Sequence, residues 1–207
     1  LPKGTSITEV ADGGKGRNTV SLGLSDGSVL ITQDIYNVTY PDNHRVITPA
    51  VEFPLGPAPL PVDAQKRALY VATDTGVLAY YDIADPEAPR LVQQLGVVPP
   101  RTTLTGLRLL AGGISLLVAS SDGRISQWFP VRNAANQPML QRIRSFSIDA
   151  PVTALAPESA RKGFVAANNK GELGIYHTTA GKEVLRVAVS DQALHTLTVA
   201  PRSNAVL

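Results

Sequence analysis

Short apolar runs alternate with polar turns along the chain, and this pattern predicts strands rather than helices. No stretch keeps apolar residues at helical spacing over three turns. Instead, β-branched and aliphatic runs are bounded by Asp-Gly, Asn-Lys-Gly and Pro-rich turns, which is typical of hairpins. Four hairpin cores align, each with an apolar run, a polar turn that ends in Gly and a second strand: residues 21–31, 69–79, 116–126 and 164–174.

The hairpin cores recur at an even interval. Their turn glycines are Gly27, Gly76, Gly123 and Gly171, which are separated by 49, 47 and 48 residues. Five residues after each of the last three glycines stands an aromatic residue, and the first copy has Thr32 in that place. We expect the aromatic residues on the third strand of each unit, where they pack between units or, less simply, form a recognition surface. They are Tyr81, Trp128 and Tyr176.

A repeat of about 48 residues lies within the range of β-propeller blades. We therefore predict an all-β fold, a β-propeller-like array of four-stranded antiparallel repeats with four units and a partial fifth. A lone hairpin is marginal in water, so the units must stack to bury their faces. The alternative is a β-sandwich or an open meander of irregular hairpins. We expect a single domain, a piece of a longer chain, with units at residues 1–56, 57–100, 101–149 and 150–193 and a partial unit at 194–207.

The turn sequences predict how each hairpin closes. The Asp-Gly pairs within residues 25–28 and 121–124 favour two-residue type I′ turns, in which both central residues need a positive φ. The turns at residues 73–76 and 168–171 are one residue longer and end in Gly, which favours bulged hairpins.

Composition excludes several classes of function. The net charge is only +2 in 207 residues, so no nucleic-acid partner is expected. There is no cysteine, which excludes disulfides and thiolate sites. The uncharged stretch at residues 109–121 is shorter than the roughly 20 residues that a membrane helix needs.

No catalytic pattern stands out in the sequence. The three histidines have no metal-ligand spacing and no nucleophile motif is present, so we expect no enzyme, metal or cofactor. Asp26, Asp74 and Asp122 recur at the turns, where turn chemistry accounts for them without a catalytic role.

Candidate contact residues lie in two polar segments of the first unit. The Gly-rich run at residues 12–17 carries Lys15 and Arg17, and such a run can cradle an anion or serve as an ordinary connecting loop. His44 and Arg45 lie in a segment expected to be an exposed loop. We predict these four residues as partner or anion contacts. Arg142 and Arg144 alternate with their neighbours, so we expect both on one exposed face of a strand.

One region resembles a known family. Residues 22–31, 36–42, 45–49 and 53–56 resemble the extracytoplasmic insert of enlarged permease subunits of bacterial phosphate ABC transporters. The resemblance implies a propeller-like domain on the periplasmic side of the bacterial inner membrane, carried by a membrane-embedded parent chain. Its implied function is that of a non-catalytic accessory domain that docks or regulates at the outer mouth of the importer. The implied partners are other transporter subunits and the periplasmic phosphate-binding protein. The alternative is a free extracytoplasmic β-propeller scaffold for protein–protein interaction.

Overall fold

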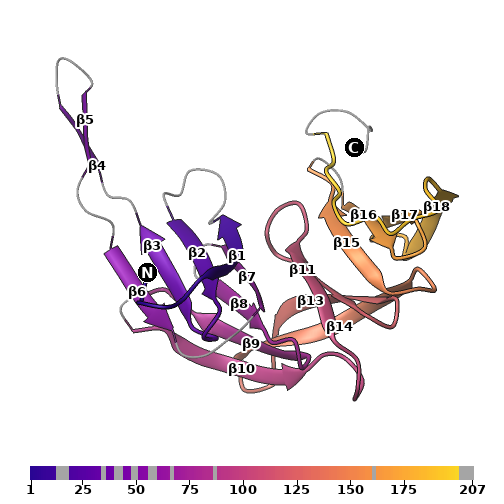
Figure 1. The fold of residues 1–207 in the computed structure, drawn as a ribbon. Coiled ribbons are helices and arrows are strands. Elements are labelled where there is room, and N and C mark those ends of the chain that lie inside the picture. Colours follow the sequence, from indigo (N-terminus) through magenta and orange to yellow (C-terminus); the bar gives the residue numbers. More distant parts are fainter. Residues whose placement is uncertain are drawn as a thin grey trace. The chain divides into compact units, whose positions relative to one another are not determined.

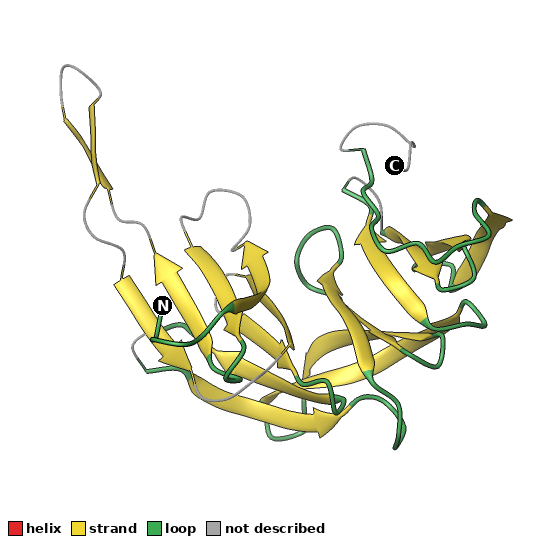
Figure 2. Ribbon diagram, in the orientation of Figure 1, coloured by secondary structure: helices red, strands yellow, loops and turns green. Residues whose placement is uncertain are grey.

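The computed structural model describes residues 1–12, 19–33, 36–39, 44–47, 51–55, 60–65, 68–85, 88–159 and 162–200. In these residues the regular structure is entirely strand (Figures 1 and 2). The strands form four antiparallel four-stranded sheets and one two-stranded hairpin. The prediction of an all-β fold built from four-stranded antiparallel repeats is confirmed. No helix in the described residues is long and apolar enough to cross a membrane.

The chain divides into two compact units, of which the first comprises residues 1–73 and 78–94. Its first sheet has the order β1-β2-β3-β6, and β4 and β5 form a separate hairpin between β3 and β6. The bounds are β1 Ile7–Asp12, β2 Thr19–Leu24, β3 Val29–Gln33, β4 Tyr36–Thr39, β5 His44–Ile47 and β6 Val51–Leu55. The next sheet comprises β7 Leu60–Gln65, β8 Ala68–Ala72, β9 Val77–Asp82 and β10 Arg90–Gly96.

Alternate residues of β3 and β8 form the core of the first unit. Val29 and Ile31 on β3 are buried together with Leu69 and Val71 on β8. Residues two apart on a strand share a face, so each strand contributes one side of this apolar layer. Tyr81 on β9 packs against the same core from a partly buried position.

The second unit comprises residues 74–77 and 95–207. One of its sheets comprises β11 Leu104–Leu109, β12 Leu116–Ser120, β13 Arg124–Arg132 and β14 Pro138–Ser147. The other comprises β15 Val152–Pro157, β16 Gly163–Asn168, β17 Glu172–His177 and β18 Lys182–Ala188.

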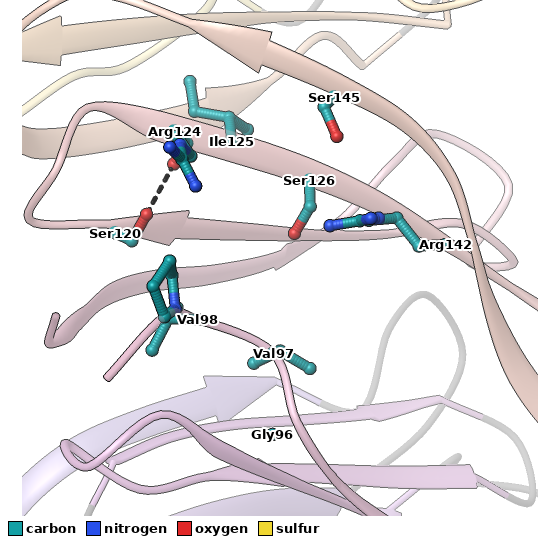
Figure 3. Close-up of a pocket in the computed structure, with 10 residues that line it drawn as sticks. Gly96, Val97, Val98, Ser120, Arg124, Ile125, Ser126, Arg142 and Ser145 are labelled. Carbon is teal, nitrogen blue, oxygen red and sulfur yellow. Dashed lines mark hydrogen bonds between the residues drawn. The ribbon is translucent and has the colours of Figure 1, made fainter. Parts of the chain in front are cut away.

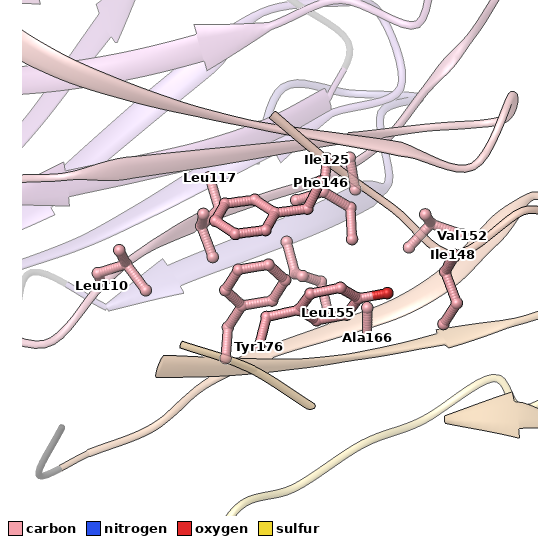
Figure 4. Close-up of a cluster of buried hydrophobic side chains, with 11 residues drawn as sticks. Leu110, Leu117, Ile125, Phe146, Ile148, Val152, Leu155, Ala166 and Tyr176 are labelled. Atoms are coloured by element: carbon pink, nitrogen blue, oxygen red, sulfur yellow. The ribbon is translucent and has the colours of Figure 1, made fainter. Parts of the chain in front are cut away.

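Three aromatic rings hold these last two sheets together (Figure 4). Phe164 and Tyr176 are stacked with centroids 4.8 Å apart. Phe146, from the neighbouring sheet, meets both edge-on, with centroids 5.1 Å and 5.6 Å away. Such pairs contribute roughly 0.5–1.5 kcal/mol beyond the burial of their area. Aliphatic side chains such as Leu117 and Ile125 complete this core, and both are fully buried.

The repeated aromatic residues lie where the sequence predicts them. Tyr81, Trp128 and Tyr176 are on β9, β13 and β17, the third strand of their sheets, and Thr32 is on β3. Trp128 is 8% exposed, and its indole Nε1 donates to Ser126 Oγ at 2.9 Å. Packing therefore explains the series within the described residues, as it does most directly for the stacked Tyr176.

The turn glycines play the same structural role in successive sheets. Gly27, Gly76, Gly123 and Gly171 all have a φ between +77° and +83°. In three of them the carbonyl also accepts a hydrogen bond from the segment that leaves the same sheet. The donors are Val97 to Gly76 at 2.9 Å, Ile148 to Gly123 at 3.0 Å and Val189 to Gly171 at 3.0 Å. Each hairpin turn is thus tied to the exit of its own sheet.

The prediction of type I′ turns is wrong. Asp26 and Asp122 are not among the residues with positive φ, and only the following glycine has one. The Gly27 amide instead donates to the Leu24 carbonyl at 3.0 Å, which makes a three-residue turn that ends in a glycine bulge. Asp26 accepts from the Ser28 amide at 2.9 Å and from its hydroxyl at 2.6 Å. These bonds favour the ordinary φ for Asp26, and they lower the pKa of its carboxyl.

The prediction that Arg142 and Arg144 share a face is also wrong. Trp128 pairs with Arg142 and Gln127 pairs with Arg144, so Ile143 is an extra residue that makes a β-bulge. Adjacent residues on β13 point to opposite faces, and their partners therefore do the same. Arg144 reaches the Thr179 carbonyl at 3.5 Å.

The described part of the predicted fifth unit, residues 194–200, contains one isolated bridge residue, Val199, and no strand. The Leu194 amide donates to the Asn168 carbonyl at 3.3 Å, and Thr153 Oγ1 donates to the Leu194 carbonyl. This segment is therefore attached to the sheet of β15 and β16. Residues 201–207 lie outside the described residues.

Candidate functional site

A pocket of about 250 Å³ lies on one face of the sheet of β12, β13 and β14 in the second unit (Figure 3). Two segments line it. The end of β10 and the chain that follows it supply Gly96, Val97, Val98 and Pro99, and the sheet supplies Ser120, Arg124, Ile125, Ser126, Arg142 and Ser145.

The strand register explains why these polar side chains meet. Ser126 is the cross-strand partner of Ser145, and Trp128 is the partner of Arg142. Ser126 and Trp128 are two residues apart on β13, so all four side chains share a face. The bulge at Ile143 makes this possible, because without it Arg142 would face away from Ser145.

The opposite wall of the pocket is apolar and anchored. The Val97 amide donates to the Gly76 carbonyl at 2.9 Å, which holds the segment after β10 in place. Val98 packs closely over Gly76, where an added Cβ would meet its Cγ2. Val97 and Val98 are half-buried. The Val97 and Val98 side chains that form this wall are therefore held in place by contacts with the turn glycine Gly76.

Of the two arginines, only Arg124 has an acidic neighbour in the described part of the chain. Its Nε lies 3.4 Å from Asp122 Oδ2. Asp122 also accepts from Ser120 Oγ at 2.6 Å. The Arg142 guanidinium has no ion pair or hydrogen bond to any described residue, and it points toward Ser126 in Figure 3. The pocket therefore carries one uncompensated positive charge.

The hydroxyls differ in what they can offer a ligand. Ser126 Oγ accepts from the Trp128 indole at 2.9 Å and donates to the Val118 carbonyl at 3.5 Å, so its one donor is already used within the sheet. Ser145 is exposed. None of the lining residues is a histidine or a carboxylate, although the Asp122 carboxylate accepts from the hydroxyl of Ser120, which lines the pocket. The Arg142 guanidinium gives this pocket a group that can bind an anion.

A second charged cluster ties β18 to the turn before β15. Arg186 donates to Asp149 Oδ2 at 2.6 Å and, through two nitrogens, to Glu183 at 2.6 and 3.0 Å. Arg186 Nη2 and the Tyr176 hydroxyl both donate to the Ser147 carbonyl, at 3.0 and 2.8 Å. Every charged member of the cluster has a partner, so the cluster is structural.

The cluster shifts the pKa values of its members. The bond from Arg186 lowers the pKa of Asp149. Burial, and after it the nearby Glu183 carboxylate, raises the pKa of Tyr176 to about 12. The bond to Glu183 raises the pKa of Arg186. These shifts link the stability of this region to pH.

The structure does not test the contact residues that the sequence predicts. Lys15 and Arg17 lie outside the described residues. The backbone of His44 and Arg45 begins β5, where they pair with Thr39 and Val38 of β4, and the structure does not describe their side chains. The prediction of a loop at His44 and Arg45 is therefore wrong, because both residues begin a strand. Within the described residues, no three His, Cys, Asp or Glu side chains are grouped as a metal site would require.

Comparisons with known proteins identify the fold. No protein-family model matches the chain, and no curated protein matches it. Among solved structures, Sqt1 of Chaetomium thermophilum, bound to the N-terminus of the ribosomal protein L10, has a TM-score of 0.70 at 12% identity over 97% of this chain. The Cps50 (Swd1) β-propeller domain of Myceliophteria thermophila has a TM-score of 0.66 at 15% identity over 97% of this chain. Sqt1 of Saccharomyces cerevisiae has a TM-score of 0.67 at 11% identity over 95% of this chain.

The extent of the matches differs among these proteins. The alignment covers 55% and 52% of the two Sqt1 chains and 78% of the Cps50 domain. This chain thus spans about half the length of Sqt1. The likeness establishes that the described sheets are β-propeller blades, as predicted.

Proposed function

We propose that this chain is a non-catalytic protein-interaction module, with the Arg142 pocket as one of its contact sites. The observation that carries the proposal is a solvent-accessible cation without a partner in the described residues, set beside an apolar wall. Blades of this fold hold their strands rigidly and leave loops and sheet faces for recognition. Sqt1, which has a similar fold, is bound to a segment of another protein, and this supports a binding role.

The narrower form of the proposal places the module in a phosphate ABC importer. The resemblance of residues 22–56 to the insert of enlarged permease subunits supports this assignment. The domain would then lie on the periplasmic side of the bacterial inner membrane, joined to a membrane-embedded parent chain. There it would dock the periplasmic phosphate-binding protein or other transporter subunits.

A binding measurement tests this proposal. The phosphate-binding protein of the same bacterium is immobilised, with and without phosphate, and the 207-residue chain is titrated over it by biolayer interferometry. Saturable binding supports the importer assignment. Absence of binding in both phosphate states refutes a direct contact with that protein.

The genetic context separates the importer from the free scaffold. Reading the coding DNA on both sides of this segment is expected to show an apolar span before it and several spans after it. A signal peptide before it and no spans after it would instead favour the free extracytoplasmic scaffold.

A further inference from the structure

The Arg142 pocket combines features that small inorganic anions do not require. One side carries the Arg142 guanidinium and the Ser145 hydroxyl, and the other carries Val97 and Val98. Phosphate sites in proteins gather several positive charges or backbone amides around one compact ion. Here one cation stands without an acidic neighbour in the described residues, and the facing wall is aliphatic.

The size of the pocket also favours a larger ligand. Its volume is about 250 Å³, whereas a water molecule occupies roughly 30 Å³ of liquid. A carboxylate joined to a methylene stem would use both walls, because the charged end meets the cation and the stem covers the valines. Charge-assisted hydrogen bonds from guanidinium to carboxylate are about twice as strong as neutral ones, and the two flat groups match in shape.

We propose that the Arg142 pocket receives a glutamate side chain from a segment of the partner protein. The inference rests on the proposed interaction function and assigns the chemistry of the contact. The glutamate carboxylate accepts from the Arg142 guanidinium and from the Ser145 hydroxyl, and its methylene groups lie against Val97 and Val98. The rest of the partner segment passes over the mouth of the pocket.

The bulge at Ile143 supplies a matched control for this site. Arg142 and Arg144 lie on the same strand, but they face opposite sides of the sheet. Arg142→Gln and Arg144→Gln therefore remove the same charge from the same strand, and only the first changes the pocket. Arg142→Lys keeps the charge but loses the planar fork that binds a carboxylate with two hydrogen bonds.

The test uses two short peptides and inorganic phosphate as probes. The peptides are acetyl-Ala-Ala-Leu-Glu-Leu-Ala-Ala-amide and its counterpart with Gln in place of Glu. Binding to the 207-residue chain is followed by NMR of the backbone amides and of the arginine Nε–H groups. We expect the Glu peptide to shift the Arg142 Nε–H signal and the Val97 and Val98 amides. The Gln peptide is expected to bind at least about tenfold more weakly.

The variants complete the test. Arg142→Gln is expected to weaken the Glu peptide by about tenfold or more, Arg142→Lys by less, and Arg144→Gln not at all. Equal affinity of the chain for the Glu and Gln peptides would overturn the proposal. An equal loss of affinity for the Glu peptide in Arg142→Gln and Arg144→Gln would also overturn it. Tighter binding of phosphate than of the Glu peptide at these signals would identify a small-anion site and overturn it as well.

Failure of this inference is distinct from failure of the proposed function. One result would overturn the glutamate assignment alone: the Glu peptide does not bind, and the phosphate-binding protein binds the Arg142→Gln variant as tightly as it binds the original chain. Glu-selective peptide binding at Arg142, without binding of the phosphate-binding protein, would support the glutamate assignment and refute that partner.

Discussion

Replacing Gly123 by Ala tests whether the repeated turn glycines are required for contact as well as for backbone conformation. Gly123 has φ +83°, which an L side chain rarely adopts. A Cβ at this position would lie 2.7 Å from the Ala150 carbonyl oxygen and 2.8 Å from the Ala150 amide nitrogen. Both atoms belong to the backbone that leads from β14 to β15, so relief of the overlap would move that connection. The same movement would strain the bond from the Ile148 amide to the Gly123 carbonyl.

Gly112 provides the matched control for the loss of stability expected in Gly123→Ala. It lies in the same unit with φ +91°, and an added Cβ would meet nothing within 4 Å. Gly112→Ala should therefore lose only the cost of the left-handed conformation, about 1–2 kcal/mol. Gly123→Ala should lose that amount and a further cost of overpacking, about 1–3 kcal/mol. The expected difference between the two variants is the second cost alone.

Urea unfolding followed by tryptophan fluorescence measures this difference. The chain has one tryptophan, Trp128, which is buried in the second unit and therefore reports on the unit that holds both glycines. The free energy of unfolding should fall clearly further in Gly123→Ala than in Gly112→Ala. Equal losses in the two variants would refute the argument that the close approach to Ala150 matters.

Three further predictions concern the core and the charged cluster. Phe164→Ala should cost about 3–5 kcal/mol in urea unfolding, because the ring is fully buried in the aromatic core. Its control is Val184→Ala, at a residue that is 66% exposed, which should change stability by less than about 0.5 kcal/mol. The pKa of Tyr176 is raised to about 12, so its neutral form stabilises the fold below about pH 10. The free energy of unfolding should therefore fall by roughly 1.4 kcal/mol per pH unit between pH 10 and 12. Tyr176→Phe should show a shallower decline there, and an unchanged slope would contradict the assignment. Asp149 has its pKa lowered by Arg186, so its contribution is present at neutral pH and is lost on acidification below about pH 4. Asp149→Asn should flatten this acid limb in unfolding measured from pH 7 to pH 3, and identical curves would count against the ion pair.

Much of the fold is predictable from the residue types in the turns and from the even spacing at which these turns recur along the sequence. The turn glycines mark positions where φ must be positive, and their even spacing identifies the repeating sheet. The backbone conformation of each turn is harder to predict from the sequence. Asp26 favours an ordinary φ through bonds to Ser28, and its Asp-Gly sequence alone does not distinguish this arrangement from a type I′ turn.

The candidate site was only partly accessible from the sequence. Arg142 and the serines around it are visible in the sequence, but strict alternation assigns Arg142 to the face of Arg144. The bulge that separates them has no local signal such as a glycine, because the extra residue is Ile143. The segment after β10 joins the site through a hydrogen bond from Val97 to Gly76, and no pattern of polarity predicts that contact.

The bulge at Ile143 also constrains how this strand can change during evolution. Leu140 pairs with Pro130 on one side of the bulge, and Phe146 pairs with Ile125 on the other. Both are buried, and the extra residue directs them to opposite faces of one sheet. A deletion of one codon between them would force one of these side chains out of its core. Homologues of this blade are therefore expected to tolerate exchange of residue identity in β14 far more readily than a change of its length by one.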